Sequence, residues 1–116
     1  MANTITVNSV ERGTKMLQGA FSDMWFVTAT ISDQDAVAIN DSLGVALAVP
    51  GVALGDMVIG QSLTVDTSDG TDFAIVHCEV SAANVVQFRV HADVGEFAAD
   101  ALNNGVIKVL VGRPSW

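Results

Sequence analysis

The feature that most constrains the fold is a pair of alternating runs joined by a short connection. Residues 73–80 and 86–91 alternate apolar with polar side chains, and Ser81-Ala82-Ala83-Asn84 separates them. Alternation over this length is typical of half-buried β-strands. Because a slip of one residue would exchange the two faces, even-numbered residues must pair with even-numbered residues. The sequence therefore predicts a β-hairpin with one apolar and one polar face.

This predicted hairpin divides its side chains between the core and an outward face. The core face carries Ala74, Val76, Cys78, Val80, Val86, Phe88 and Val90. The outward face carries both histidines of the chain, His77 and His91, beside Glu79 and Arg89. Cys78 is the single cysteine, so it forms no disulfide within the chain and belongs to no zinc pattern. We expect it to be an inert core thiol.

Other apolar segments bounded by turn residues predict an all-β domain. Candidate strands cover residues 24–31, 37–40, 44–49, 56–59, 62–65 and 106–111. Pro50-Gly51 fits a turn with proline at its first central position, and Gly60 marks a bulge or kink. Residues 96–102 have helical spacing and precede Asn103-Asn104-Gly105, which predicts one short helix. The pattern indicates a compact β-sandwich, jelly-roll-like fold or small barrel.

The N-terminal residues differ from the rest, and we expect an extended arm at 1–20 followed by a single β domain at 21–116. Ile5 and Val7 alternate with polar residues, but no hairpin partner follows closely. We therefore expect the arm to pair with a distant strand or with another chain. The expected arm contacts are Thr4, Ile5, Val7, Val10, Arg12 and Lys15.

Charge and composition exclude several classes of partner. The net charge is −8, with 13 acidic and 5 basic residues, and positions 16–88 contain no lysine or arginine. Nucleic acids and anionic membranes both select clustered basic residues, so neither is expected as a partner. Half of the 116 residues are hydrophobic, which favours an oligomer that covers part of the surface.

Targeting and membrane signals are not found in the sequence. Residues 1–20 lack the basic start and apolar run of a secretory signal. The uncharged stretch at 42–55 is interrupted by Pro50 and is too short to cross a bilayer. We expect a soluble protein made inside the cell.

No residue pattern for catalysis accompanies the strands, so no enzyme activity, metal or cofactor is expected. A Gly-x-Ser-x-Gly nucleophile motif is missing. A small hydrolytic enzyme would require a cleft that gathers His77 or His91 with a carboxylate. The two histidines could bind metal at a symmetry axis, but the sequence marks no further ligands. Residues 66–72 are similar to a calcium loop but lack its final glutamate.

Aromatic residues give no clear sugar-binding platform. Trp25 and Phe26 are consecutive on a predicted strand, so they point to opposite faces. One is expected in the core and the other at an interface. Trp116 is expected to be either frayed or docked in a groove of a partner. The residues expected at an oligomer contact or outer face are Trp25, His77, Arg89 and His91.

From Pro50 onward the chain resembles the small decoration, or cement, proteins of tailed-bacteriophage heads. The resemblance lies in Gly55-Asp56-x-Val58, the hairpin connection at 80–86, the polar segment at 93–100 and the closing strand at 106–111. It implies a compact sandwich or jelly-roll trimer on the capsid exterior, at three-fold or quasi-three-fold positions. The implied partners are the major capsid protein and further copies of the chain.

A second hypothesis remains open beside capsid cementing. The chain could be a head-fibre or tail-associated module that recognises a host-surface glycan or receptor. Cementing predicts that the N-terminal arm carries the affinity. Host recognition predicts that the distal loop at 66–72 carries it.

Overall fold

The computed structural model describes residues 3–13, 19–65, 68–69, 72–96 and 98–116, and this part of the chain is all-β. Its strands are β1 (Thr4–Gly13), β2 (Phe21–Asp33), β3 (Ser42–Ala48), β4 (Met57–Leu63), β5 (Ser68–Asp69), β6 (Asp72–Ala82), β7 (Val85–Val94) and β8 (Val106–Pro114). The predictions of strands at 24–31, 44–49 and 106–111, and of the 73–80 and 86–91 hairpin, are confirmed.

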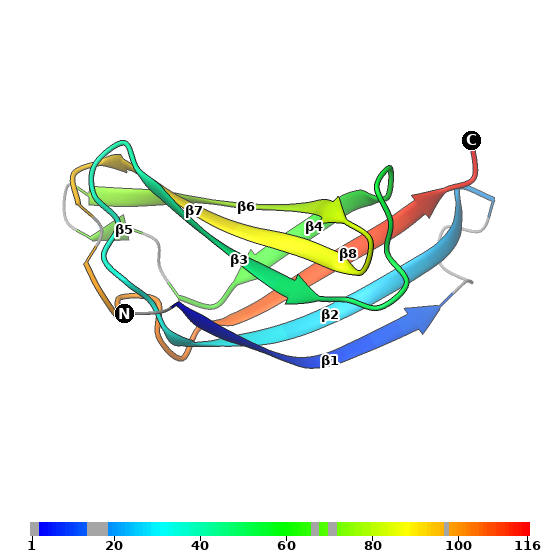
Figure 1. Cartoon of the computed structure of the whole chain (residues 1–116), viewed down its shortest axis with the longest axis horizontal. Helices are drawn as coiled ribbons and strands as arrows, with labels where there is room; N and C mark the ends of the chain where they lie inside the picture. The colour runs from blue at the N-terminus through cyan, green and yellow to red at the C-terminus, as the bar shows by residue number, and fades with distance from the viewer. Residues whose placement is uncertain (1–2, 14–18, 66–67, 70–71, 97) are drawn as a thin grey trace.

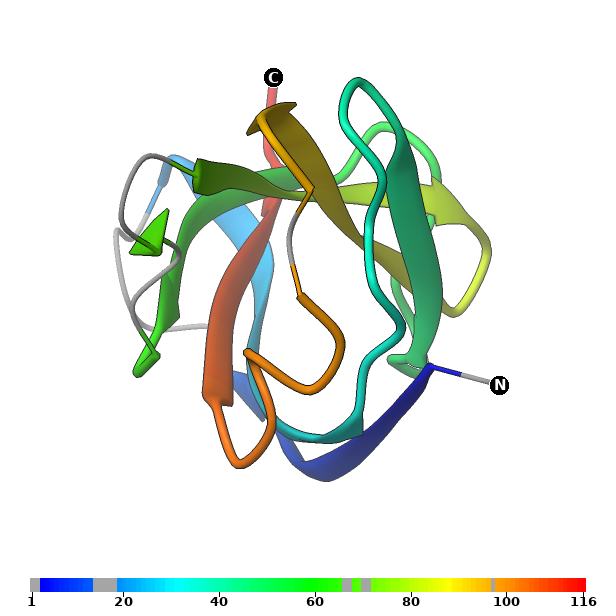
Figure 2. The same cartoon turned by 90° about the vertical axis from the view of Figure 1, so that its left-hand side faces the viewer.

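The strands form two antiparallel sheets that pack face to face (Figures 1 and 2). One sheet has the order β1-β2-β8-β4 and the other the order β3-β7-β6-β5. The molecule is elongated, measuring 44 × 23 × 22 Å. We call the end that holds Pro50 and Pro114 the proline end, and the opposite end, which holds Gln34 and Gly105, the Gln34 end.

At the Gln34 end, two segments cross between the sheets side by side. Residues 34–41 lead from β2 to β3, and residues 95–105 lead from β7 to β8. The amide of Asp100 donates to the carbonyl of Gln34 at 2.8 Å, and the amide of Asn104 donates to that of Ile31 at 2.8 Å. The two connecting segments therefore pass from one sheet to the other as a hydrogen-bonded pair.

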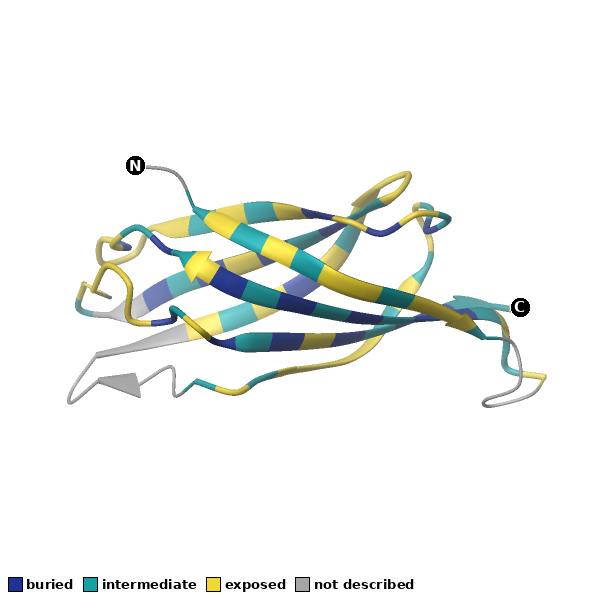
Figure 3. Ribbon diagram, turned by 90° about the horizontal axis from the view of Figure 1, so that it is seen from below, coloured by how far each residue is buried: buried dark blue, intermediate teal, exposed yellow. Residues whose placement is uncertain are grey.

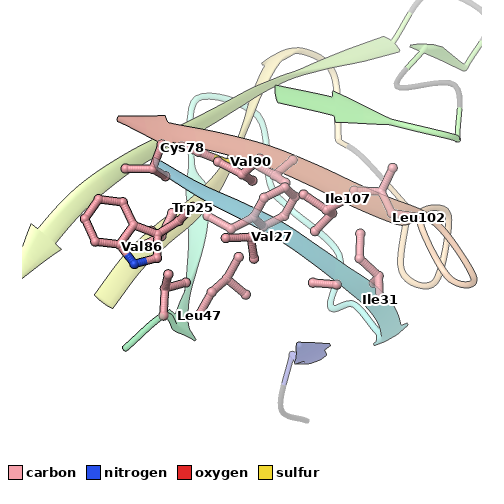
Figure 4. Packing of buried hydrophobic residues seen from close by; sticks show 14 of the residues in the cluster. Trp25, Val27, Ile31, Leu47, Cys78, Val86, Val90, Leu102 and Ile107 are labelled. Atoms are coloured by element: carbon pink, nitrogen blue, oxygen red, sulfur yellow. The ribbon is translucent and has the colours of Figure 1, made fainter. Parts of the chain in front are cut away.

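The core lies between the sheets and follows the predicted alternation (Figure 4). Trp25, Val27 and Ile31 of β2 point inward, and Cys78, Phe88 and Val90 meet them from the hairpin. The even-to-even register is confirmed, since Cys78 pairs with Phe88 and Val76 with Val90. Along β2 and β8, buried residues alternate with less buried ones in bands (Figure 3).

Two local expectations are not confirmed. Residue 37 makes an isolated bridge, and residues 38–41 form no strand. Residues 99–104 form turns where a short helix was expected over 96–102, and residue 97 lies outside the described residues. Asp100 and Asn104 have φ values of 62° and 66°, which an α-helix does not contain. The side chain of Gln34, which accepts the amide of Leu102 at 3.1 Å, holds the turns instead.

The expectation that the N-terminal segment lacks a partner close in sequence is wrong. β1 pairs with β2, the next strand of the same chain, from Thr4 opposite Asp33 to Gly13 opposite Met24. Ile5, Val7 and Val10 pack against the core. Residues on both sides of position 20 thus share one sheet.

Candidate interaction surface

The outer face of the β1-β2-β8-β4 sheet is the candidate functional surface. Residues paired across antiparallel strands point to the same side of a sheet. Phe26 of β2 lies opposite Glu11 of β1 and Leu110 of β8. Because the neighbouring residues Trp25 and Val111 point into the core, this row points outward.

Apolar side chains gather on this face toward the proline end. We call the following residues the outer apolar patch: Phe21, Phe26, Met57, Ile59, Leu110 and Trp116. Met57, Ile59 and Trp116 are 44%, 39% and 79% exposed, and the rings of Phe21 and Trp116 are 5.8 Å apart. Exposed apolar side chains grouped in this way mark an interaction surface.

Glycine at position 112 shapes the patch. A Cβ atom at Gly112 would lie 2.6 Å from the ring of Phe21 and 2.8 Å from the side chain of Ile59. Only a residue without a side chain lets these two groups close over β8. Met24, which lies between Gly13 and Gly112, is fully buried although it is outside the core cluster. The glycines therefore let large apolar groups lie flat on the sheet.

An open hollow of about 420 Å³ continues the patch along the same face. Its walls combine the apolar groups of Phe26 and Leu110 with the polar groups of Thr28, Ser62 and Lys108. The bulge in β4, predicted at Gly60, is confirmed by the register shift between Val58 and Gly60 and opens one side of the hollow. The hollow can accept an apolar group with hydrogen-bonding neighbours.

Two arginines neutralise the carboxylates at the proline end. Arg12 donates to both carboxylate oxygens of Asp23, at 2.9 and 2.6 Å. The hydrogen bond from Arg12 lowers the pKa of Asp23, and the same bond raises the pKa of Arg12. Both guanidinium groups, of Arg12 and Arg113, lie over the Trp25 ring, 5.0 and 5.1 Å from its centroid.

Arg113 fixes the loop that precedes β4. It donates to both oxygens of Asp56 at 2.9 Å and to the carbonyl of Gly51 at 2.9 Å. The Asp56 side chain is only 4% exposed, and its hydrogen bond raises the pKa of Arg113. Gly51, with φ of 100°, completes the turn predicted at Pro50-Gly51. These contacts hold residues 50–56, and therefore the start of β4, against the sheet.

The expected arm residues have different environments. Ile5, Val7 and Val10 are partly buried and pack against the core of their own chain. Arg12 is paired with Asp23. Thr4 is exposed, and Lys15 lies outside the described residues.

The expected outer-face residues are only partly brought together. Arg89 donates to Glu79 at 3.3 Å, and His77 lies 4.0 Å from the other oxygen of that carboxylate. His91 is partly buried on the same face of the hairpin. The expectation for Trp25 as an outer-face contact is wrong, because its ring is fully buried and its Nε1 donates to the carbonyl of Pro50 at 3.1 Å.

Cys78 lies in the core as expected. Its side chain is buried, and desolvation raises the pKa of the thiol to about 11. The thiolate form is therefore rare at neutral pH, which makes this cysteine unreactive in the folded chain.

At the Gln34 end, Asp33 lies near other carboxyl groups. Burial, followed by the nearby Asp100 and Asp35, raises the pKa of Asp33. Among the described residues, no group of three or more His, Cys, Asp or Glu side chains is placed to hold a metal ion. Most of the predicted 66–72 loop lies outside the described residues or has undescribed side chains.

Sequence reasoning missed the outer apolar patch because its residues come from distant segments. Phe21, Met57 and Trp116 meet only after β2, β4 and β8 have paired. The local signal was the run Met57-Val58-Ile59-Gly60, where apolar residues occupy both faces of a strand beside a bulge.

The described residues contain no helix long and apolar enough to span a membrane. Comparison with protein-family models, with curated proteins and with solved structures finds no match for this chain.

Proposed function

We propose that this chain is a structural virion protein that binds the exterior of a tailed-phage head as a homotrimer and cements neighbouring capsid subunits. In this proposal it has no catalytic activity and needs no cofactor. Its partners are the major capsid protein and its own copies, without nucleic acid or membrane. The resemblance of residues 50–116 to decoration proteins supports the proposal, as does the all-β fold.

The observation that carries the proposal is the position of β1 at the edge of its sheet. Among the described strands, β1 pairs with β2 alone. From Thr4 to Ser9 its exposed side chains are short and polar, as at Thr4, Thr6 and Ser9, and the charged Glu11 follows toward the end of the strand. An edge of this kind can accept a strand of another protein through backbone hydrogen bonds. Capsid subunits that present an extended segment would therefore bind here.

Cementing then follows from multivalency. A trimer has three such edges, so it can contact several capsid subunits at once. Each further contact is made at high effective concentration. Binding to the assembled shell alone stabilises that shell by mass action. The net charge of −8 would keep unbound copies soluble.

The proposal includes a jelly-roll arrangement of the two sheets. β2 pairs with β8 in one sheet, and β3 pairs with β7 in the other. The connections from β2 to β3 and from β7 to β8 cross at the Gln34 end as a hydrogen-bonded pair. Two antiparallel chains that roll together from one sheet to the other are typical of jelly rolls.

The test is co-sedimentation with undecorated heads of the phage that encodes the chain. Thr6→Lys places a charge on the β1 edge and should weaken binding by about tenfold, because lysine on an edge strand opposes strand addition. Ser81→Lys adds the same charge to an exposed position of β6 and should bind like the unmodified chain. Failure of the unmodified chain to sediment with heads, or undiminished binding by Thr6→Lys, would contradict the proposal.

The second candidate is a head-fibre or tail-associated module that recognises host glycans. The hollow favours it, because Phe26, Thr28 and Ser62 all line it. Aromatic rings with nearby hydrogen-bonding groups suit a sugar. Glycan binding that is lost in Phe26→Ala, in a chain that does not bind heads, would replace the first proposal with this one.

A further inference from the structure

We infer that copies of this chain associate through the outer apolar patch, with the patch of one copy packed against that of the next. The inference rests on the proposed function only for the number of copies. The contact itself is argued from the distribution of apolar and charged groups, which does not involve a capsid.

Charge is distributed unevenly along the long axis of the molecule. The Gln34 end carries five described acidic residues, none of them in a salt bridge with another described residue: Asp33, Asp35, Asp41, Glu96 and Asp100. At the proline end, Asp23 and Asp56 are both paired with arginines. Because the net charge is −8, copies repel one another most strongly where their acidic ends approach. Contact through the proline half of the molecule has the lowest electrostatic cost.

Most of the large exposed apolar side chains also lie in the proline half of the molecule. Met57, Ile59 and Trp116 belong to the patch near Gly112, and Leu54, which is 72% exposed, lies in the turn just before β4. Among the residues whose side chains the structure describes, the other large exposed apolar residues are Ile39 and Ile75. Ile39 is in a turn at the Gln34 end, and Ile75 is on β6 in the opposite sheet. Both lie away from the patch, so neither of these two described residues extends it.

The same outer face carries one charge of each sign. Glu11 lies opposite Phe26, and Lys108 lies opposite Thr28 on the other side of β2. Both side chains are exposed. A face with one carboxylate and one ammonium group is complementary to a second copy of itself, because Glu11 of one copy can meet Lys108 of the next. This complementarity favours another copy of the chain over a partner of single charge.

The first test measures the mass of the full chain by sedimentation equilibrium. Met57→Ser combined with Ile59→Ser should raise the dissociation constant between copies by at least about tenfold. Ile39→Ser combined with Ile75→Ser changes side chains of similar exposure elsewhere and should leave it unchanged. Thermal unfolding of both variants checks that neither loses the fold.

A charge-reversal pair gives a second, milder test. Lys108→Glu places two carboxylates where copies meet and should weaken association by about fivefold. Adding Glu11→Lys to Lys108→Glu restores opposite charges and should return the dissociation constant to within about twofold of the starting value. Rescue of this kind does not arise from misfolding.

The outcomes separate this inference from the proposed function. A chain that is monomeric at all concentrations, or patch variants that associate normally, would overturn the inference whether or not heads are bound. If only the Ile39→Ser and Ile75→Ser double variant dissociated, the copies would meet through another surface. That result would also overturn the inference. Association through the patch by a chain that ignores phage heads would leave the inference intact and remove the cementing function.

Discussion

Trp25 connects the core to the ion pairs at the proline end. Its ring is fully buried, and the guanidinium of Arg113 lies over it while binding Asp56 and Gly51. The Asp56 carboxylate is nearly inaccessible to water. Removal of Arg113 would leave this carboxylate without its arginine partner. An unpaired buried charge is costly, whereas replacement of an exposed pair is nearly neutral.

Arg113→Ala is therefore expected to lower the free energy of unfolding by about 2 kcal/mol. Arg89→Ala, which breaks the exposed pair with Glu79, should change it by less than about 0.5 kcal/mol. Urea unfolding monitored by tryptophan fluorescence measures both variants. Similar losses in the two variants would show that the Asp56 contact does not hold the 50–56 loop.

Asp33 gives the molecule a pH dependence of opposite sign to that of an ordinary salt-bridged aspartate. Burial, followed by the nearby Asp100 and Asp35, raises the pKa of Asp33 in the folded chain. The folded state therefore binds this proton more tightly than the unfolded state does. The stability contributed by protonation is present at low pH and is lost as the pH rises through the folded pKa.

At pH 7 the ionised Asp33 carboxylate destabilises the folded chain. Asp33→Asn removes this charge and should make the chain more stable than the unmodified protein at pH 7. The difference should shrink in acid, where Asp33 is protonated in both states. Asp41→Asn removes one charge from an exposed position at the same end and separates the local effect from the change in net charge. Urea unfolding at neutral and acid pH measures the difference. Unchanged or lower stability of Asp33→Asn at pH 7 would contradict the assignment.

Among the elements, β1 shows most clearly that an expected arm is part of the folded sheet. Val7 packs against the core, and its neighbour Thr6 is exposed. Val7→Ala is expected to destabilise the chain by about 1 kcal/mol, and Thr6→Ala by less than half of that. Thermal unfolding compares the two. Equal effects would indicate that β1 is detached from the sheet in solution.

Elements whose structure is determined by residues close in sequence were predicted correctly from the sequence, and elements that depend on distant residues were not. The 73–80 and 86–91 hairpin was predicted with its register, because alternation and the Asn84 turn act within a few residues. The partner of β1 was not predicted, because residues 14–20 give no hairpin signal. Residues 96–102 have helical spacing, but bonds from the distant Gln34 and left-handed backbone at Asp100 give turns instead.

The candidate surface was less predictable than the fold. Trp25 and Phe26 were correctly assigned to opposite faces, but which one faced outward depends on how β2 packs against the second sheet. The patch also depends on Gly112, whose lack of a side chain matters only because Phe21 and Ile59 close over it. Because the patch depends on neighbours from three strands, no local sequence pattern predicts it.

For the whole molecule, two separate surfaces of one sheet are assigned to two kinds of contact. The β1 edge is proposed to bind the capsid, and the outer apolar patch is inferred to bind other copies. The second contact should respond directly to the net charge of −8, since it brings identical acidic chains together. The salt dependence of association between copies therefore distinguishes two cases. In one, charged groups attract the copies to each other; in the other, apolar groups hold the copies together against long-range repulsion.

The field of each copy extends about 30 Å at low salt, comparable to the 44 Å length of the molecule, and only about 8 Å at physiological salt. Added salt should therefore weaken the repulsion between copies more than it weakens the single exposed Glu11 and Lys108 pair, which contributes little. We expect the dissociation constant between copies to fall about threefold from about 10 mM to about 150 mM sodium chloride. Sedimentation equilibrium measures it, with Lys108→Glu as a variant of greater net charge that should respond more strongly. If added salt weakened association instead, attraction between charged groups such as Glu11 and Lys108 would outweigh the repulsion between copies, which would contradict a contact held together mainly by apolar groups.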